Sequence, residues 1–196
     1  MRGVRAALLM TALGSTGPAF PGAAAAPVPT PRGGMIPAPV VMTADTARPA
    51  TQFAGLFVQA CMAFAGDAAG LRGWAAKTGL PALPDQVAAV LLHNAPGRAF
   101  DASPAGTKLA LVSSDDGICA VVTDRAAQAA VTESLEAALT QAGVAFRLAI
   151  DRDDTRTRPL HFREYLATRT SRSWRILAAT VNDPVGGQAM LTAAPE

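Results

Sequence analysis

The hydrophobic pattern of this chain changes its period, and that change restricts the possible folds more than any other feature of the sequence. Between Thr51 and His93, apolar residues recur three or four positions apart, which is the period of amphipathic helices. From Lys108 onward, with one helical interruption, apolar and polar residues alternate as they do in half-buried strands. The pattern therefore predicts an α+β fold in which N-terminal helices precede an antiparallel sheet and the helices pack on one face of it.

Three helices are predicted in the first part of this region. The first begins at Thr51 and carries an apolar stripe that includes Cys61. The second runs from Asp67 to Lys77, with the aspartate as its cap. The third covers 85–93 and carries three apolar residues on one side, Val87, Val90 and Leu91.

The rest of the chain is predicted to follow the order β-β-α-β-β-β-β. The first two strands, 108–113 and 118–123, are separated by Ser114-Asp115-Asp116-Gly117, which is a strong hairpin signal. Asp124 is the expected cap of a long helix that runs to Ala142. Glu164 falls on the apolar side of its strand, a position that requires a bulge or a sheet edge. The later strands are predicted at 144–150, 160–167, 174–181 and 188–193.

The first 25 residues are typical of a secretory signal peptide. Arg2 and Arg5 precede a short apolar run at 6–13, and small residues follow at 22–26. A retained N-terminal anchor is the alternative, although the run is far shorter than the roughly 20 residues of a membrane-spanning helix. Prolines and alanines then predict a flexible linker at 26–50, so that 51–196 form a single domain.

The charge balance excludes one large class of partner. The net charge of +2 comes from Arg2 and Arg5, so that a chain processed near residue 25 has equal numbers of basic and acidic residues. Dedicated nucleic-acid-binding domains have a clear basic excess, and we expect no nucleic-acid partner. We also expect no stable membrane insertion once the signal peptide has been removed.

Export determines the expected oxidation state of the two cysteines, Cys61 and Cys119. Paired cysteines of exported proteins usually form disulfides, and with two cysteines there is one possible intramolecular pairing. The alternative is two free, buried thiols that pack as small apolar side chains. We expect the disulfide.

No catalytic residue, metal site or cofactor can be assigned from the sequence. A Cys61–His161 catalytic pair would need an accessible thiol, whereas Cys61 lies on an apolar helix stripe. The acidic groups at 115–117 and 151–154 lack calcium-loop spacing and are better explained as a turn and a solvated loop. We therefore expect a non-enzymatic protein, with a small hydrolase that uses carboxylates near His161 as the alternative.

Arginine is concentrated late in the chain, with eight residues between positions 147 and 175. Strand alternation is expected to turn four residues outward to form a partner-binding face, namely Arg147, His161, Arg163 and Tyr165. Its partner would be an anionic ligand or a protein of the cell envelope. The alternative is an ordinary exposed sheet face, balanced by Asp151, Asp153, Asp154 and Glu164.

The stretch Ala105-Gly-Thr-Lys-Leu-Ala-Leu-Val-Ser-Ser-Asp-Asp-Gly-Ile-Cys-Ala-Val121, together with the helical element from Phe53 to Cys61, resembles small exported bacterial proteins of uncharacterised function. The resemblance spans roughly Phe53 to Val181. It implies a periplasmic or secreted location and linked cysteines, and it transfers no active-site residue. We therefore expect a binding or accessory protein of the cell envelope.

Overall fold

The computed structural model describes residues 44–104, 106–154, 159–181 and 187–196, with side chains from Arg48 onward. All of these residues belong to the unit Val40–Glu196. The expected signal peptide at 1–25 and the first part of the expected linker, 26–43, lie outside the described residues.

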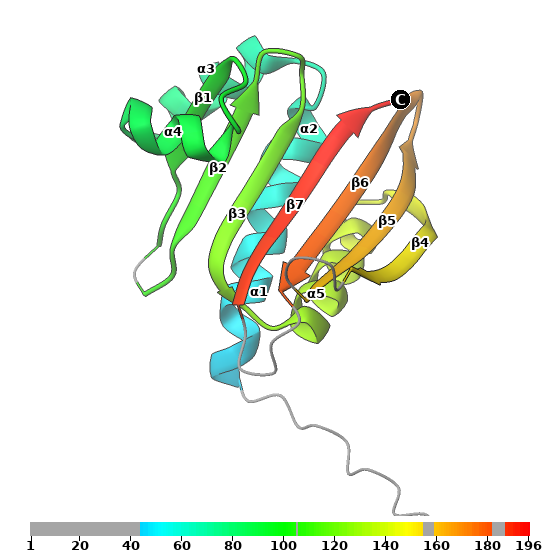
Figure 1. Ribbon diagram of the computed structural model, residues 1–196. Coiled ribbons are helices and arrows are strands. Elements are labelled where there is room, and N and C mark those ends of the chain that lie inside the picture. Colours follow the sequence, from blue (N-terminus) through cyan, green and yellow to red (C-terminus); the bar gives the residue numbers. More distant parts are fainter. Residues whose placement is uncertain (1–43, 105, 155–158, 182–186) are drawn as a thin grey trace, which may run out of the picture. The chain divides into compact units, whose positions relative to one another are not determined.

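Seven antiparallel strands form one sheet, in the order β1-β2-β3-β7-β6-β5-β4 (Figure 1). This confirms the antiparallel sheet and the α+β class. The first strand, β1, precedes the predicted ones and pairs with β2 at the edge of the sheet. The strands are β1 (Gly97–Asp101), β2 (Leu109–Ser114), β3 (Cys119–Ala126), β4 (Ala145–Asp154), β5 (Leu160–Arg169), β6 (Arg172–Val181) and β7 (Gly187–Pro195).

The helices fall into an N-terminal group and one long helix inserted after β3. The N-terminal group contains α1 (Ala44–Leu56), the π-helical segment η1 (Phe57–Cys61), α2 (Met62–Phe64), α3 (Ala68–Lys77) and α4 (Asp85–Leu91). The long helix is α5 (Gln128–Gln141). No helix among the described residues is long and apolar enough to cross a membrane.

The main core lies between one face of the sheet and α1, η1, α3 and α5. Phe53 and Phe57 on the first helical element and Leu135 and Leu139 on α5 are fully buried there. The sheet contributes buried apolar side chains from its central strands, among them Leu111, Val121, Ile176 and Leu191. In Figure 1, α1 and α5 lie behind the sheet on this face, which we call the helix face.

One helix packs on the opposite face, which corrects the expectation that all helices share one face. Leu92, just after α4, is buried with Ala99 of β1, Val112 of β2 and Ala120 of β3. The apolar residues of α4 are not all on its packed side, because Val87 and Val90 are exposed. In a helix this short, Ala88, Leu91 and Leu92 are enough to cover the three strands beneath it.

Three predicted boundaries are wrong for a common reason. Helix α1 begins at Ala44, inside the expected linker 26–50, and continues through Pro49 because Ala50 and Phe53 are buried. Strand β3 continues through Asp124, so Ala127 precedes α5 instead of the predicted aspartate cap. Strand β4 continues through 151–154, where a loop was expected, because β5 pairs with it along that length. In each case tertiary pairing or packing overrides local propensity.

The hairpin and the cysteine pair lie where the sequence placed them. The turn between β2 and β3 contains Gly117 at φ +88°, a conformation that glycine adopts without strain. The sulfur atoms of Cys61 and Cys119 form a disulfide, with the two Cα atoms 5.2 Å apart. This bond links η1 to the first residue of β3 and so fixes the helical layer to the middle of the sheet.

Candidate functional site

The conspicuous polar cluster of the molecule lies at the end of the sheet formed by β4 and β5. A bulge at Ala149 shifts the register, since Leu148 pairs with Tyr165 whereas Ile150 pairs with Glu164. A one-residue shift moves each following side chain to the other face of the sheet. Asp151 and Asp153 therefore lie on the helix face, opposite Arg163 and His161 respectively.

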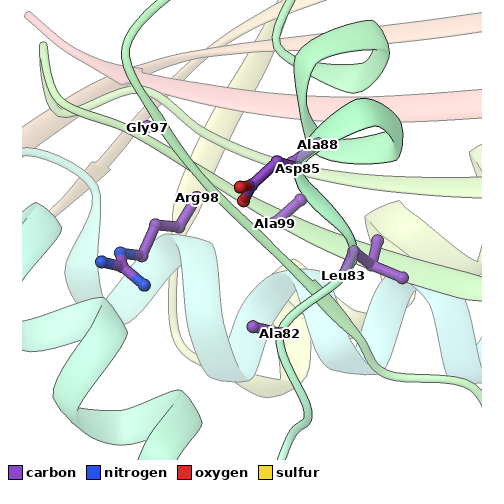
Figure 2. A pocket seen from close by; sticks show the side chains of 7 residues that line it. All are labelled: Ala82, Leu83, Asp85, Ala88, Gly97, Arg98 and Ala99. Atoms are coloured by element: carbon purple, nitrogen blue, oxygen red, sulfur yellow. The ribbon is translucent and has the colours of Figure 1, made fainter.

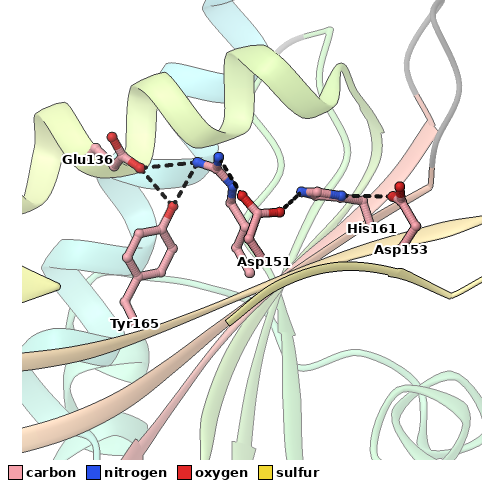
Figure 3. A network of polar contacts seen from close by, with 6 residues as sticks. Glu136, Asp151, Asp153, His161 and Tyr165 are labelled. Atoms are coloured by element: carbon pink, nitrogen blue, oxygen red, sulfur yellow. Dashed lines mark hydrogen bonds and ion pairs between the residues drawn. The ribbon is translucent and has the colours of Figure 1, made fainter. Parts of the chain in front are cut away.

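These side chains form a continuous network that reaches from α5 to the end of β4 (Figure 3). The Tyr165 hydroxyl donates a hydrogen bond of 2.8 Å to Glu136 Oε1 on α5. Arg163 lies between the two halves, 3.3 Å from the Glu136 carboxylate and 2.8 Å from Asp151 Oδ2. His161 has a carboxylate on each side, with Nε2 3.1 Å from Asp151 and Nδ1 2.9 Å from Asp153.

Burial determines the proton chemistry of the network. Tyr165 is 1% exposed. Burial, followed by its hydrogen bond to Glu136, raises the pKa of Tyr165 to about 12. Burial alone would lower the pKa of Arg163, but hydrogen bonds and charge interactions with Tyr165 and Asp151 outweigh it and raise that pKa. Tyr165 and Arg163 therefore both retain their protons at neutral pH.

The geometry of the network favours a structural role over hydrolysis. A general base needs an imidazole nitrogen within reach of water or substrate. Both nitrogens of His161 instead face carboxylates, and its side chain is 13% exposed. Among the described residues, no group of three or more His, Cys, Asp or Glu side chains could hold a metal ion. The network connects β4 to β5 and α5.

The predicted binding face does not exist as one surface. His161, Arg163 and Tyr165 lie on the helix face and belong to the network, and Tyr165 is also part of the main core. Arg147 pairs with Leu166 and lies on the opposite face. The interpretation was wrong because alternation shows which side chains share a face but not which face is covered. The helices pack on the Tyr165 side of β5, and Phe162, Glu164 and Leu166 lie on the opposite side.

The opposite face carries a surface that the sequence analysis did not identify. Beyond the strands beneath α4, β7, β6 and β5 present a group of half-buried apolar side chains, among which Glu164, Arg175 and Thr192 also lie on this face. Register places them together, since Phe162, Ala179 and Met190 are neighbours in one row across the three strands. We call this set the open strip: Leu160, Phe162, Leu166, Leu177, Ala179, Val181 and Met190.

Arginines lie at the β4 border of the open strip and, at Arg175 of β6, between Leu166 and Leu177 within it. Arg175 pairs with Glu164 at 3.2 Å. Arg152 lies over the ring of Phe162, with 5.2 Å between its guanidinium carbon and the ring centroid. Neither Arg147 nor Arg152 forms an ion pair with a carboxylate among the described residues, so two cationic groups remain available at this border.

Two hollows flank α4 on the same face. The smaller, about 190 Å³, lies between the start of α4 and β1, and Figure 2 shows Asp85 and Arg98 among the residues that line it. The larger, about 510 Å³, lies between α4 and the sheet and includes Val87, Leu91 and Val122. It continues the apolar surface from α4 toward β7, where Gln188 also lines it.

Comparison with known proteins adds no family or relative. No protein-family model matches the chain, and no curated protein or solved structure matches it.

Proposed function

We propose that this is an exported, non-enzymatic protein of the cell envelope that acts by associating with a protein partner through the open strip. The observation that supports this proposal is the unequal covering of one sheet face. Val112 and Ala120, beneath α4, are 5% and 8% exposed, whereas the apolar residues of the open strip remain half-buried. A group of apolar side chains left uncovered in this way is typical of interaction sites.

The border of the open strip favours a protein partner over a small apolar ligand. Arg147 and Arg152 are near the strip and lack carboxylate partners among the described residues. Arginine beside an apolar centre is typical of protein interfaces, where it forms charge-assisted hydrogen bonds with partner carboxylates. The partner surface should therefore have an apolar centre and acidic residues at one side.

Export rests on the sequence, from the basic start, the short apolar run and the small residues at 22–26. The disulfide is compatible with an oxidising compartment. Intact-mass measurement should give a mature chain that begins near residue 25 and is recovered in the exported fraction. An unprocessed Met1, or recovery with membranes, would contradict this part of the proposal.

Binding is tested with the full chain immobilised after export and exposed to an envelope extract. The test variant is Leu177→Asp, in the middle of the open strip. The control is Leu148→Asp, which alters an exposed apolar residue of β4 on the helix face. We expect wild type and the control to capture the same protein and the test variant to lose it. Equal capture by all three folded proteins would contradict a role for the open strip.

A further inference from the structure

A second apolar feature on the same face has no partner within the described chain. Helix α4 exposes 73% of Val90, although another side of the helix is packed on the sheet. Val87, 45% exposed, lines the hollow between the helix and the sheet. The exposed apolar surface of α4 and the open strip beside it have complementary shapes, so that a helix like α4 can pack on a surface like the strip. One is convex and the other is a flat sheet surface.

The topology puts these two features side by side. Helix α4 covers β1, β2 and β3, and the open strip begins at β7, the next strand in the sheet. Figure 1 shows α4 in front of β1 and β2, with β3 between it and the strands β7, β6 and β5. The hollow between α4 and Val122 connects the two regions.

We infer that the partner of the open strip is a second copy of this chain, an inference that rests on the proposed function. A two-fold axis parallel to the strands, between α4 and the open strip, places α4 of each copy on the open strip of the other. The two copies of α4 then lie side by side in one layer between two sheets. Such a layer is about 10 Å thick, the diameter of one helix.

This arrangement is self-complementary, as a closed two-fold interface requires. Each copy supplies one helix and accepts one, so both unmatched features are covered at the same time. A foreign partner on the open strip would leave Val90 exposed unless it also covered α4. A second copy of the chain covers both the open strip and Val90 and needs no surface beyond these two.

The charges agree with this pairing. Asp85 is the charged residue of α4, and it lies on the side of the helix next to β1. The two-fold axis places the β1 side of one copy over the β4 side of the other. Asp85 is thereby brought toward the border where Arg147 and Arg152 form no ion pair with a carboxylate of the described residues. Opposite charges at the edge of an apolar contact favour one register over others.

The first experiment measures the mass of the full exported chain in solution by sedimentation equilibrium over a wide range of concentration. We expect twice the mass of one chain for wild type and for Leu148→Asp. Val90→Asp and Leu177→Asp should each give the mass of one chain, because each alters a different side of the same contact. Circular dichroism establishes that the variants remain folded.

The second experiment tests the reciprocal geometry. Val90→Cys and Leu177→Cys proteins are prepared separately, mixed and mildly oxidised. The mixture should form a cross-linked pair that contains one chain of each kind, in far higher yield than a mixture of Leu148→Cys with Val90→Cys. Cross-linking that does not distinguish these mixtures would overturn the inferred contact.

The outcomes separate this inference from the proposed function. A wild-type chain that stays monomeric at all concentrations, but captures an envelope protein through the open strip, overturns the dimer and leaves the proposed function standing. A monomer that captures nothing through the strip overturns both. A dimer unaffected by Val90→Asp and Leu177→Asp uses another surface, and it also overturns the inference.

Discussion

The two halves of one sheet face differ in what covers them, although their sequences follow the same alternating pattern. Beneath α4, Ala99, Val112 and Ala120 are buried. On β6, Leu177 is half-buried and lies outside the cluster that these residues form, and Met190 of β7 is half-buried at the edge of the cluster. The comparison shows that alternation determines which side chains share a face. It does not determine whether the chain itself closes that face.

The largest expected difference between the halves appears when a charge is introduced into each. Val112→Asp places a carboxylate beneath α4 without a cationic partner, and it should lower the free energy of unfolding by about 3–5 kcal/mol. Leu177→Asp in the open strip should cost about 1 kcal/mol in the dissociated chain, because water still reaches the site. Urea denaturation measures both. Equal losses would show that the halves are equally covered.

The disulfide holds the helices on the helix face of the sheet, because Cys61 and Cys119 are both buried in the main core. Replacing either with serine should lower the free energy of unfolding by about 2–5 kcal/mol, as for native disulfides of small exported domains. Denaturation of Cys61→Ser and Cys119→Ser under identical conditions measures the loss. Stoichiometric thiol labelling of denatured, unreduced wild type would show that the bond is absent.

Tyr165 gives a pH-dependent test of how well the helix face is closed. Its pKa is raised from 10.0 to about 12 in the folded protein, whereas the unfolded chain retains the ordinary value. The neutral phenol therefore stabilises the folded state fully below pH 10. This stabilisation, about 3 kcal/mol, should be lost as the pH rises from 10 to 12.

The chain contains one tyrosine, so phenolate absorbance reports on Tyr165 alone. Titration of the folded protein should give an apparent pKa near 12. Tyr165→Phe should lack the corresponding fall in stability between pH 10 and 12. A titration midpoint near 10 in the folded protein would show that the phenol is open to solvent.

The smallest effect on stability is expected at the arginine border. Reversing Arg147 and Arg152 to glutamate should change the free energy of unfolding by about 0.5 kcal/mol. The same reversal should weaken association, and added salt should weaken the wild-type association as well. Arg163→Glu is the informative contrast, because it removes the centre of the polar network and should destabilise the fold. Unchanged association of the double reversal at low salt would exclude a role for the border.

Features determined by local sequence could be predicted. The hairpin around Asp115 and Gly117 follows from turn chemistry, and the second helix follows from the cap at Asp67, whose side chain accepts a hydrogen bond of 2.8 Å from Gly70 N. The antiparallel sheet follows from alternating runs joined by short turns. These signals act over a few residues and need no knowledge of distant partners.

The candidate site could not be predicted because it depends on long-range register. The bulge at Ala149 has no marker in the sequence, yet it turns Asp151 toward Arg163 and turns Ile150 to the other face. The hydroxyl of the buried Tyr165 donates a hydrogen bond to Glu136 of α5, which lies far away in the sequence. The position of Glu164 did not signal this bulge. Strand β5 is neither bulged against β6 nor at the sheet edge, and Glu164 lies beside Phe162 and Leu166 on the face opposite the helices, paired with Arg175.

Oxidative footprinting of the wild-type chain tests the central claim most directly, by comparing dilute protein with protein at high concentration. The account predicts that labelling of Met190, Phe162 and Leu177 falls on association and that labelling of the exposed Leu148 does not change. Met62, which is 6% exposed in the main core, should remain weakly labelled throughout. Unchanged labelling across the open strip, under conditions where the protein is shown to associate, would contradict the claim that this surface is the interface.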